Sequence, residues 1–226
     1  MSSSKHILST FDEALEGLRG ELLMMASLTE KNLRNAMKCL SNRDSNLCSA
    51  TIADETEIDE LEKSIDAEGV ELLRRFQPVA SDLRQIVSII KICSNLERIA
   101  DQAVNIAKRC RKLSRDPNPG DAKQIDAMFA QSLGMVQDSI SAYRAADVSL
   151  ARSVLERDKV LDQMNHDLAA TLTATMGLAP ERITDYLNLL FIARHLERVG
   201  DHAENIAEDA IYAASAEDVR HSKVQA

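Results

Sequence analysis

Two stretches of the sequence that lie one hundred residues apart carry almost the same motif. The first is Asn95-Leu-Glu-Arg-Ile-Ala-Asp-Gln-Ala-Val-Asn-Ile-Ala-Lys108, and the second is His195-Leu-Glu-Arg-Val-Gly-Asp-His-Ala-Glu-Asn-Ile-Ala-Glu208. Eight of the fourteen positions are identical, including a Glu and an Asp four positions apart. Apolar residues recur in both stretches at the spacing of one helix face. The repeat therefore predicts two similar halves, each containing this motif on an amphipathic helix.

The similarity of the halves continues outside the motif. Asp44 matches Asp147 at an offset of 103 residues, and Pro78 matches Pro180 at an offset of 102. Between the halves, Asp116-Pro-Asn-Pro-Gly120 is the strongest turn signal in the chain. We therefore expect a first domain at 1–115, a linker at 116–120 and a second domain at 121–226.

The composition favours helices throughout the chain. Only seven Gly, four Pro and 3% aromatic residues are present, too few for a β protein with many tight turns. The apolar spacing and the helix-ending signals predict an all-α fold of two tandem antiparallel three-helix bundles, related by an internal pseudo-two-fold repeat. The predicted helices cover 5–41, 45–76 and 80–114 in the first half, and 121–145, 148–176 and 180–215 in the second.

The charge of the chain limits its partners. A net charge of −9 argues against nucleic acid, whose phosphates need Lys and Arg to neutralise them. The longest apolar runs are too short and too interrupted to span a bilayer, so no direct membrane insertion is expected. Four cysteines without a Cys-x-x-Cys spacing indicate reduced thiols in the cytoplasm.

Acidic pairs recur on the middle helices as well. At the offset of 103, Glu55-x-x-x-Asp59 matches Asp158-x-x-x-Asp162. Residues at positions i and i+4 share one helix face, and adjacent helices of a hairpin can bring two such pairs together. We therefore expect four carboxylates to face one another in each half. The candidate metal ligands are Glu55, Asp59, Glu97 and Asp101 in the first half, and Asp158, Asp162, Glu197 and Asp201 in the second.

These pairs allow more than one interpretation. Like charges at this spacing destabilise a helix by roughly 0.2–0.5 kcal/mol per pair, a cost that a hard cation bound by oxygen ligands would offset. The alternatives are a solvated helix face with Arg98 or Arg198 as ion-pair partner, or a pattern kept only by common ancestry. Glu62-x-x-x-Asp66 has the same spacing but no counterpart in the second half, so we assign it to the solvated surface.

Two histidines lie within the second motif. His195 and His202 align with Asn95 and Gln102 of the first motif, so the repeat does not keep a histidine at either position. We therefore do not expect either histidine to be an obligatory ligand.

Both copies of the motif resemble the PhoU family of phosphate-signalling regulators. The segments Arg75-Phe-Gln-Pro-Val-Ala-Ser-Asp-Leu-Arg84 and Leu190-Phe-Ile-Ala-Arg-His-Leu-Glu-Arg198 add to the resemblance, which covers nearly the whole chain. It implies a fold of two tandem three-helix bundles. The family's acidic motifs bind multinuclear metal clusters in some members, and they map here onto the same eight carboxylates, with Fe, Mn, Zn or Mg as the expected ions. One departure is Ala100, where the family's repeat commonly has Gly, as Gly200 does.

The resemblance also implies a function. Family members negatively regulate the phosphate-starvation response and limit high-affinity phosphate uptake. They are thought to couple the ATPase subunit of the phosphate ABC transporter to a phosphate-sensing membrane histidine kinase, and many are homodimers. The expectation for this chain is a metal-binding adaptor in the cytoplasm, held at the inner face of the membrane through its partners.

Two other functions remain as alternatives. A carboxylate-bridged di-metal enzyme of the ferritin-like kind would require Glu-x-x-His on two helices. That motif occurs nowhere in the sequence, nor does a phosphate-binding P-loop or a His-Glu-x-x-His. We therefore expect no enzymatic activity. A helical scaffold without metal is the second alternative.

Overall fold

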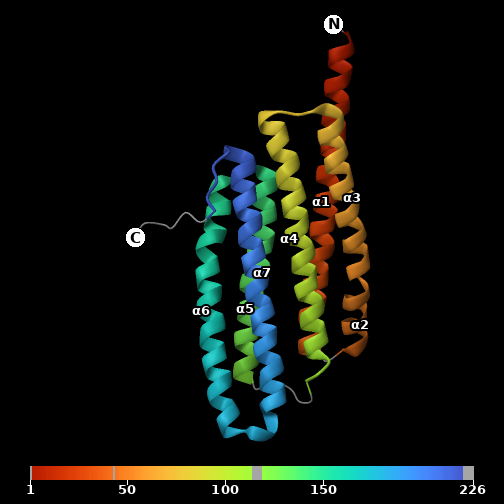
Figure 1. The fold of residues 1–226 in the computed structure, drawn as a ribbon. Helices are drawn as coiled ribbons and strands as arrows, with labels where there is room; N and C mark the ends of the chain where they lie inside the picture. The colour runs from red at the N-terminus through yellow and green to blue at the C-terminus, as the bar shows by residue number, and fades with distance from the viewer. Residues whose placement is uncertain (1, 43, 114–118, 221–226) are drawn as a thin grey trace.

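The computed structural model describes residues 2–42, 44–113 and 119–220, and within these ranges every regular element is a helix. The first half forms one antiparallel bundle and the second half forms another, so the predicted all-α fold of two three-helix bundles is confirmed (Figure 1). The predicted linker at 116–120 falls largely outside the described residues, and Pro119 already belongs to a helix. The elements are α1 (Ser2–Asn42), α2 (Ser45–Ala53), α3 (Glu55–Phe76), α4 (Ala80–Cys110), α5 (Pro119–Ala145), α6 (Val148–Leu178), the 3-10 turn η1 (Pro180–Arg182) and α7 (Ile183–Ser215).

Equivalent helices of the two halves begin with the same capping interaction. Asp44 accepts hydrogen bonds from the backbone N–H groups of Asn46 and Leu47 at the start of α2. Asp147 caps α6 in the same way, at 3.0 Å from the N–H groups of Ser149 and Leu150. An aspartate at this position satisfies N–H groups that have no partner within the helix. The matching residues found in the sequence therefore perform the same local task.

The prediction of one continuous helix over 45–76 is wrong. The helix is interrupted at Asp54, which separates α2 from α3 and leaves Glu55 as the first residue of α3. In α2, the hydroxyls of Ser49 and Thr51 each donate to the carbonyl four residues earlier. Thr171, Thr173 and Thr175 make the same kind of bond in the unbroken α6, so these bonds do not account for the interruption. The matching part of the second half, α6, runs without a break.

The other helix boundaries differ less from the prediction. α3 ends at Phe76, with Gln77 in the left-handed region just before Pro78. α4 ends at Cys110 rather than at 114, and Pro180 opens a 3-10 turn before α7 begins at Ile183. The apolar stripe expected on α1 faces the core, where Leu18, Leu22, Met25 and Leu33 are fully buried.

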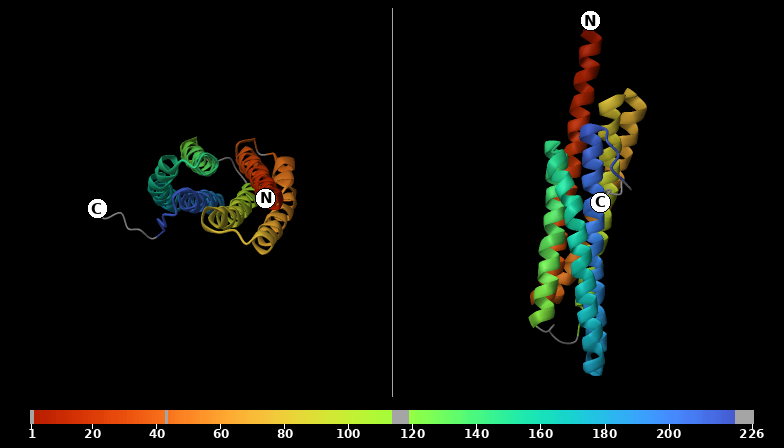
Figure 2. Two further views of the ribbon diagram at one scale, coloured as in Figure 1. Left: turned by 90° about the horizontal axis from the view of Figure 1, so that it is seen from above. Right: turned by 90° about the vertical axis from the view of Figure 1, so that its left-hand side faces the viewer.

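The halves pack side by side through α4 and α7, which run antiparallel at the centre of the molecule (Figures 1 and 2). The α3–α4 turn lies at one end of the molecule and the α6–α7 turn at the other (Figure 1). An arrangement of this kind is what a two-fold axis across the α4–α7 contact would produce.

Side-chain pairs across this contact follow the two-fold relation. The Nδ1 atom of His202 lies 3.1 Å from Asn95 Oδ1, and the Nδ1 atom of His195 lies 2.8 Å from Gln102 Oε1. The repeat relates Asn95 to His195 and Gln102 to His202, so the two pairs occupy equivalent positions on either side of the axis. The two histidines therefore contribute contacts to the junction between the halves.

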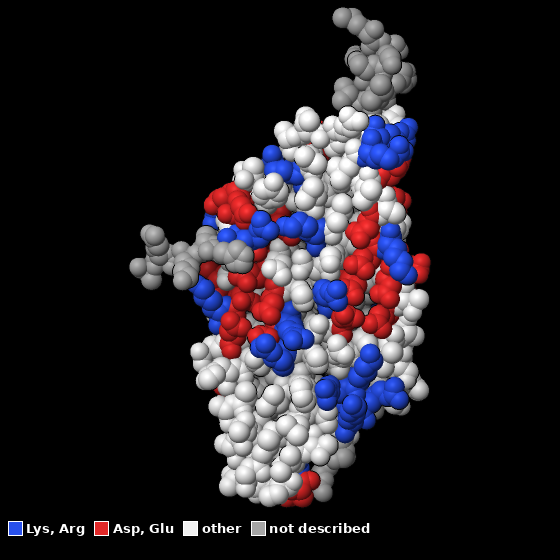
Figure 3. All heavy atoms as spheres, in the orientation of Figure 1, with Lys and Arg blue, Asp and Glu red and all other residues white. Residues whose placement is uncertain are grey.

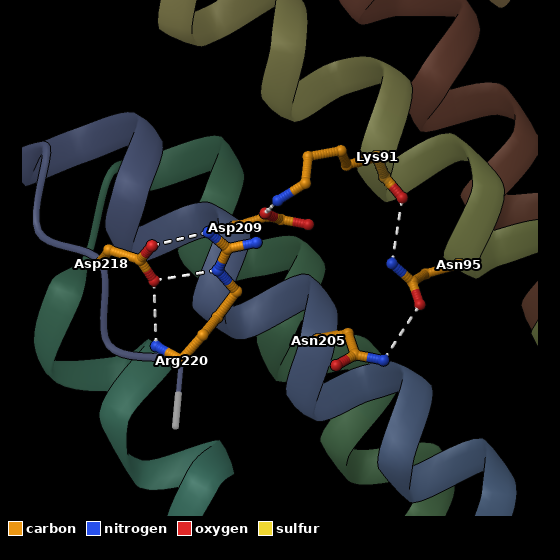
Figure 4. A network of polar contacts seen from close by, with 6 residues as sticks. All are labelled: Lys91, Asn95, Asn205, Asp209, Asp218 and Arg220. Carbon is orange, nitrogen blue, oxygen red and sulfur yellow. Dashed lines mark hydrogen bonds and ion pairs between the residues drawn. The ribbon is translucent and has the colours of Figure 1, made fainter. Parts of the chain in front are cut away.

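A second related pair shows where the halves have diverged. Lys91 on α4 forms an ion pair with the buried Asp209 on α7 (Figure 4). At the related position, the Arg109 guanidinium lies 4.0 Å from the centre of the Phe191 ring. An ion pair on one side of the axis thus corresponds to a cation–π contact on the other.

Candidate metal centre

The second-half carboxylates come together between α6 and α7. One carboxylate oxygen from each of Asp158, Asp162 and Asp201 can be chosen so that all three lie within 4.8 Å of one another. Asp158 is 8% exposed and Glu197 is 7% exposed, whereas Asp162 lies at the open side of the cluster. The cluster therefore has a buried floor and an edge that reaches solvent.

Gly200 makes this close approach of α6 and α7 possible. A Cβ atom at this position would overlap Leu161 Cδ2 and would lie 3.2 Å from Asp158 Oδ1. The absence of a side chain therefore lets Leu161 and Asp158 pack directly against the α7 backbone.

Two oxygens in the second cluster are buried without a hydrogen bond. They are Asp158 Oδ1 and Glu197 Oε2, although the other Glu197 oxygen contacts Arg194. A buried polar atom without a partner is costly, and a buried carboxylate normally pairs with a cation or coordinates a metal. The orphaned oxygens and the all-oxygen donor set therefore fit a hard cation such as Mg²⁺ or Mn²⁺, or an iron ion.

The electrostatics of the second cluster reflect its burial and its density of negative charge. Burial raises the pKa of Asp158 to about 7, and the charge of Glu204 is the next cause. Burial also raises the pKa values of Glu197 and Asp201, with further contributions from Asp201 and Asp162 respectively. Each carboxylate would thus be stabilised by a positive charge placed among them.

The first-half carboxylates also face one another, across α3 and α4. Burial raises the pKa of Glu55, and the neighbouring Asp101 carboxyl raises it further. Burial raises the pKa of Glu97 to about 7, with the Asp101 carboxylate as the next cause. The negative charge of Asp59 also raises the pKa values of Glu55 and Glu97. All four predicted residues of this half therefore lie in one cluster.

Cations of the protein already serve the first cluster. The Nε atom of Arg98 lies 3.3 Å from Glu97 Oε2, and its Nη1 atom lies 3.5 Å from Asp101 Oδ2. Lys108 lowers the pKa of Glu55, although burial outweighs it. The ion pair that the sequence suggested for Arg98 is thus present in the first half. In the second half Arg194, rather than the expected Arg198, forms the ion pair with Glu197.

Sequence reasoning missed one acidic residue in each cluster. Glu62 is half-buried and contributes to the raised pKa of Glu97, whereas Asp66 is exposed as expected. Glu204 is half-buried beside Asp158. Glu62 follows Asp59 by three positions, and Glu204 follows Asp201 by three. This spacing places them on the same helix faces and could have identified both.

Acidic side chains form two groups on one face of the molecule (Figure 3). Figure 3 shows one group of acidic side chains over α3 and α4 and another over α6 and α7, on either side of the central contact. Lys and Arg side chains border both groups (Figure 3). A partner that approaches this face could therefore reach both clusters.

The chain matches the model of the PhoU domain twice, at residues 22–110 and 125–210. The chain belongs to the PhoU family. A relative from Pseudomonas aeruginosa, named phosphate-specific transport system accessory protein PhoU homolog, is 38% identical over 97% of this chain and 91% of its own length. The accessory protein PhoU of Serratia marcescens is 32% identical over 98% of this chain and 91% of its own length.

Solved PhoU structures have the same fold. The crystal structure of PhoU from Pseudomonas aeruginosa superposes with a TM-score of 0.88 at 37% identity, covering 92% of this chain and 100% of that one. The phosphate transport system regulatory protein PhoU from Streptococcus pneumoniae gives a TM-score of 0.84 at 29% identity, covering 92% and 99%. The names of these PhoU relatives describe accessory and regulatory proteins rather than enzymes, as predicted for this chain. No helix in the described ranges is long and apolar enough to cross a membrane.

Proposed function

We propose that this PhoU-family chain is a non-enzymatic regulator of phosphate transport, which represses the phosphate-starvation response and limits high-affinity uptake. The support is the pair of PhoU domains together with relatives named as accessory proteins of the phosphate-specific transport system. Its partners in this proposal are the ATPase subunit of the phosphate ABC transporter and the phosphate-sensing histidine kinase. The protein acts in the cytoplasm as a homodimer and reaches the inner face of the membrane through these partners.

The two acidic clusters are the proposed metal sites of this adaptor. The observation that carries the metal assignment is the pair of buried, unpartnered oxygens on Asp158 and Glu197 beside the convergent Asp162 and Asp201. A bound divalent or trivalent cation would supply the positive charge that these oxygens lack. The protein's own part is to hold the carboxylates on rigid helices and to leave one side of each cluster open. The open side would let a partner's acidic or phosphate group complete the coordination.

The regulatory role is tested by deleting the gene and measuring a phosphatase reporter of the starvation response in high phosphate. We expect the reporter to be expressed although phosphate is plentiful, and the wild-type gene to restore repression. Continued repression in the deletion strain would contradict the regulatory role.

The metal assignment is tested separately, on the purified protein. After loading with Mn, Fe, Zn or Mg, the wild type should retain metal, and the Asp101→Ala/Asp201→Ala variant should retain much less. Equal, near-zero metal in both proteins would contradict metal binding, and it would leave the reporter experiment to decide the regulatory role.

A further inference from the structure

Three buried thiols line one pocket at the end of the first bundle. Cys39 is near the end of α1, Cys48 is in α2 and Cys110 is the last residue of α4. They are 1%, 2% and 6% exposed and form no disulfide. Burial raises the pKa of the Cys39 thiol, and the neighbouring Cys48 and Cys110 thiols raise it further.

A pocket gives these thiols access to small ions. It has a volume of about 180 Å³ and is lined by all three cysteines together with Ser45, Arg111 and Leu113. Arg111 is exposed and contributes a positive charge to the pocket wall. That charge offsets the negative charge of thiolates, which form only when a metal replaces their protons.

We propose that Cys39 and Cys48 form a binding site for a soft monovalent d¹⁰ metal ion, with Cu⁺ as the representative. Thiolate sulfur is the ligand that Cu⁺ prefers, and carboxylate oxygen suits harder cations, so this site differs in chemistry from the acidic clusters. Binding releases one proton to water from each coordinating thiol and changes no oxidation state. The product is a bis-thiolate complex with one net negative charge, beside the Arg111 guanidinium.

The arrangement favours two ligands rather than three. Among the residues that the structure describes, three potential ligand atoms within 4.8 Å of one another occur only in the second acidic cluster. Cys110 Sγ lies 4.0 Å from the carbonyl oxygen of Ala36 and would have to turn away from it to bind the same ion. We therefore assign Cys39 and Cys48 as the primary ligands and Cys110 as a third thiol within reach.

The chain provides an internal control for this proposal. Cys93 Sγ lies 3.5 Å from Met25 Sδ, so it is another buried pair of sulfur atoms. Both residues are 0% exposed in the core of the first bundle, and neither lines the cysteine pocket. A Cys93→Ser variant therefore tests whether any buried sulfur pair would bind the ion.

The experiment is an anaerobic titration of the reduced full-length protein with Cu⁺, in competition with the chromophoric chelator bicinchoninate. We expect the wild type and Cys93→Ser to withdraw one equivalent of Cu⁺ from the chelator. Cys39→Ser and Cys48→Ser should bind it roughly tenfold or more weakly, because even a residue that only orients a metal ligand contributes 10–100-fold to affinity. The Asp101→Ala/Asp201→Ala variant should bind Cu⁺ as the wild type does, which separates this site from the acidic clusters.

X-ray absorption spectroscopy of the copper-loaded wild type identifies the copper ligands directly, without relying on any variant. Two or three sulfur neighbours around copper are expected. Nitrogen or oxygen ligands alone, unchanged Cu⁺ affinity in both cysteine variants, or an equal loss in Cys93→Ser would overturn the proposal.

Discussion

In the second half, Gly200 lets Leu161 and Asp158 of α6 press against α7, whereas the first half has the buried Ala100 at the matching position of α4. The sequences of the two motifs differ there by one methyl group. Both clusters contain a buried Glu oxygen without a hydrogen bond, on Glu97 and on Glu197, but three carboxylates converge only in the second half among the described residues. In the first half Arg98 contacts both Glu97 and Asp101, whereas in the second half Arg194 contacts Glu197. The two sites share one repeated sequence pattern, but they differ in how strongly a bound cation would stabilise them. We expect the second half to bind metal more tightly.

The largest effect is expected from making the second half resemble the first. Gly200→Ala places a Cβ atom where it would overlap Leu161 Cδ2 and lie 3.2 Å from Asp158 Oδ1, so the packing of these two side chains against α7 must change. Overpacking of this kind destabilises a core by about 1–3 kcal/mol. Denaturant unfolding should detect the loss, and metal titration should find weaker binding to the second cluster.

Gly20→Ala is the matched control, because nothing lies within 4 Å of a Cβ atom built at Gly20 in the middle of α1. It should stabilise the protein by up to about 1 kcal/mol through helix propensity. If Gly200→Ala behaved like this control, the close approach would not be the cause of the difference between the halves.

The next effect concerns the two-fold-related contacts between α4 and α7. Lys91→Ala leaves the buried Asp209 carboxylate without its ion-pair partner, which should cost roughly 1–3 kcal/mol. Arg109→Ala removes only the cation–π contact with Phe191, worth about 0.5–1 kcal/mol. Unfolding free energies of both variants provide the measurement, and equal losses would remove this distinction between the two sides.

A smaller effect separates the two acidic clusters directly. Asp158→Asn should weaken Mn²⁺ binding roughly tenfold or more in calorimetric titration, and Glu55→Gln in the first half should weaken it less. The metal-free Asp158→Asn protein should melt at a higher temperature near neutral pH, because the variant no longer has to bury a carboxylate with an unpartnered oxygen. Equal weakening by both variants would indicate that the clusters are equivalent.

A pH dependence is also expected at the junction of the halves. Burial, followed by the charges of Arg109 and Arg198, lowers the pKa of His195 from 6.5 to about 4. Because the folded protein favours neutral His195, this contribution to stability is present above pH 6.5 and is lost as the pH falls towards 4.

His195→Asn restores the residue found at the matching position of the first half and should remove part of this acid sensitivity. Urea unfolding near pH 7 and near pH 5 provides the measurement, with wild type and variant compared at both. An unchanged difference between the two pH values would assign the acid sensitivity to other groups.

The sequence alone determined the all-α fold, the two-half organisation and the facing of the acidic pairs in each half. These features could be predicted because helical periodicity, capping residues and the hundred-residue repeat can be recognised in the sequence without knowing the tertiary structure. The break at Asp54 was not predicted, since the sequence has no glycine or proline there to indicate one. The same limit applies to Glu62, whose i+4 partner is exposed although Glu62 itself faces Glu97.

Only the tertiary structure decided how the halves meet and how their sites differ. The His195–Gln102 and His202–Asn95 pairs exist because α4 and α7 pack antiparallel about a pseudo-two-fold axis, a relation between residues distant in the sequence. The burial of Asp158 depends on how closely α6 approaches Gly200, and this distance is set by packing across two helices. Spacing along one helix identifies which residues can face a neighbour, but the partner helix fixes their depth, their hydrogen bonds and their charge.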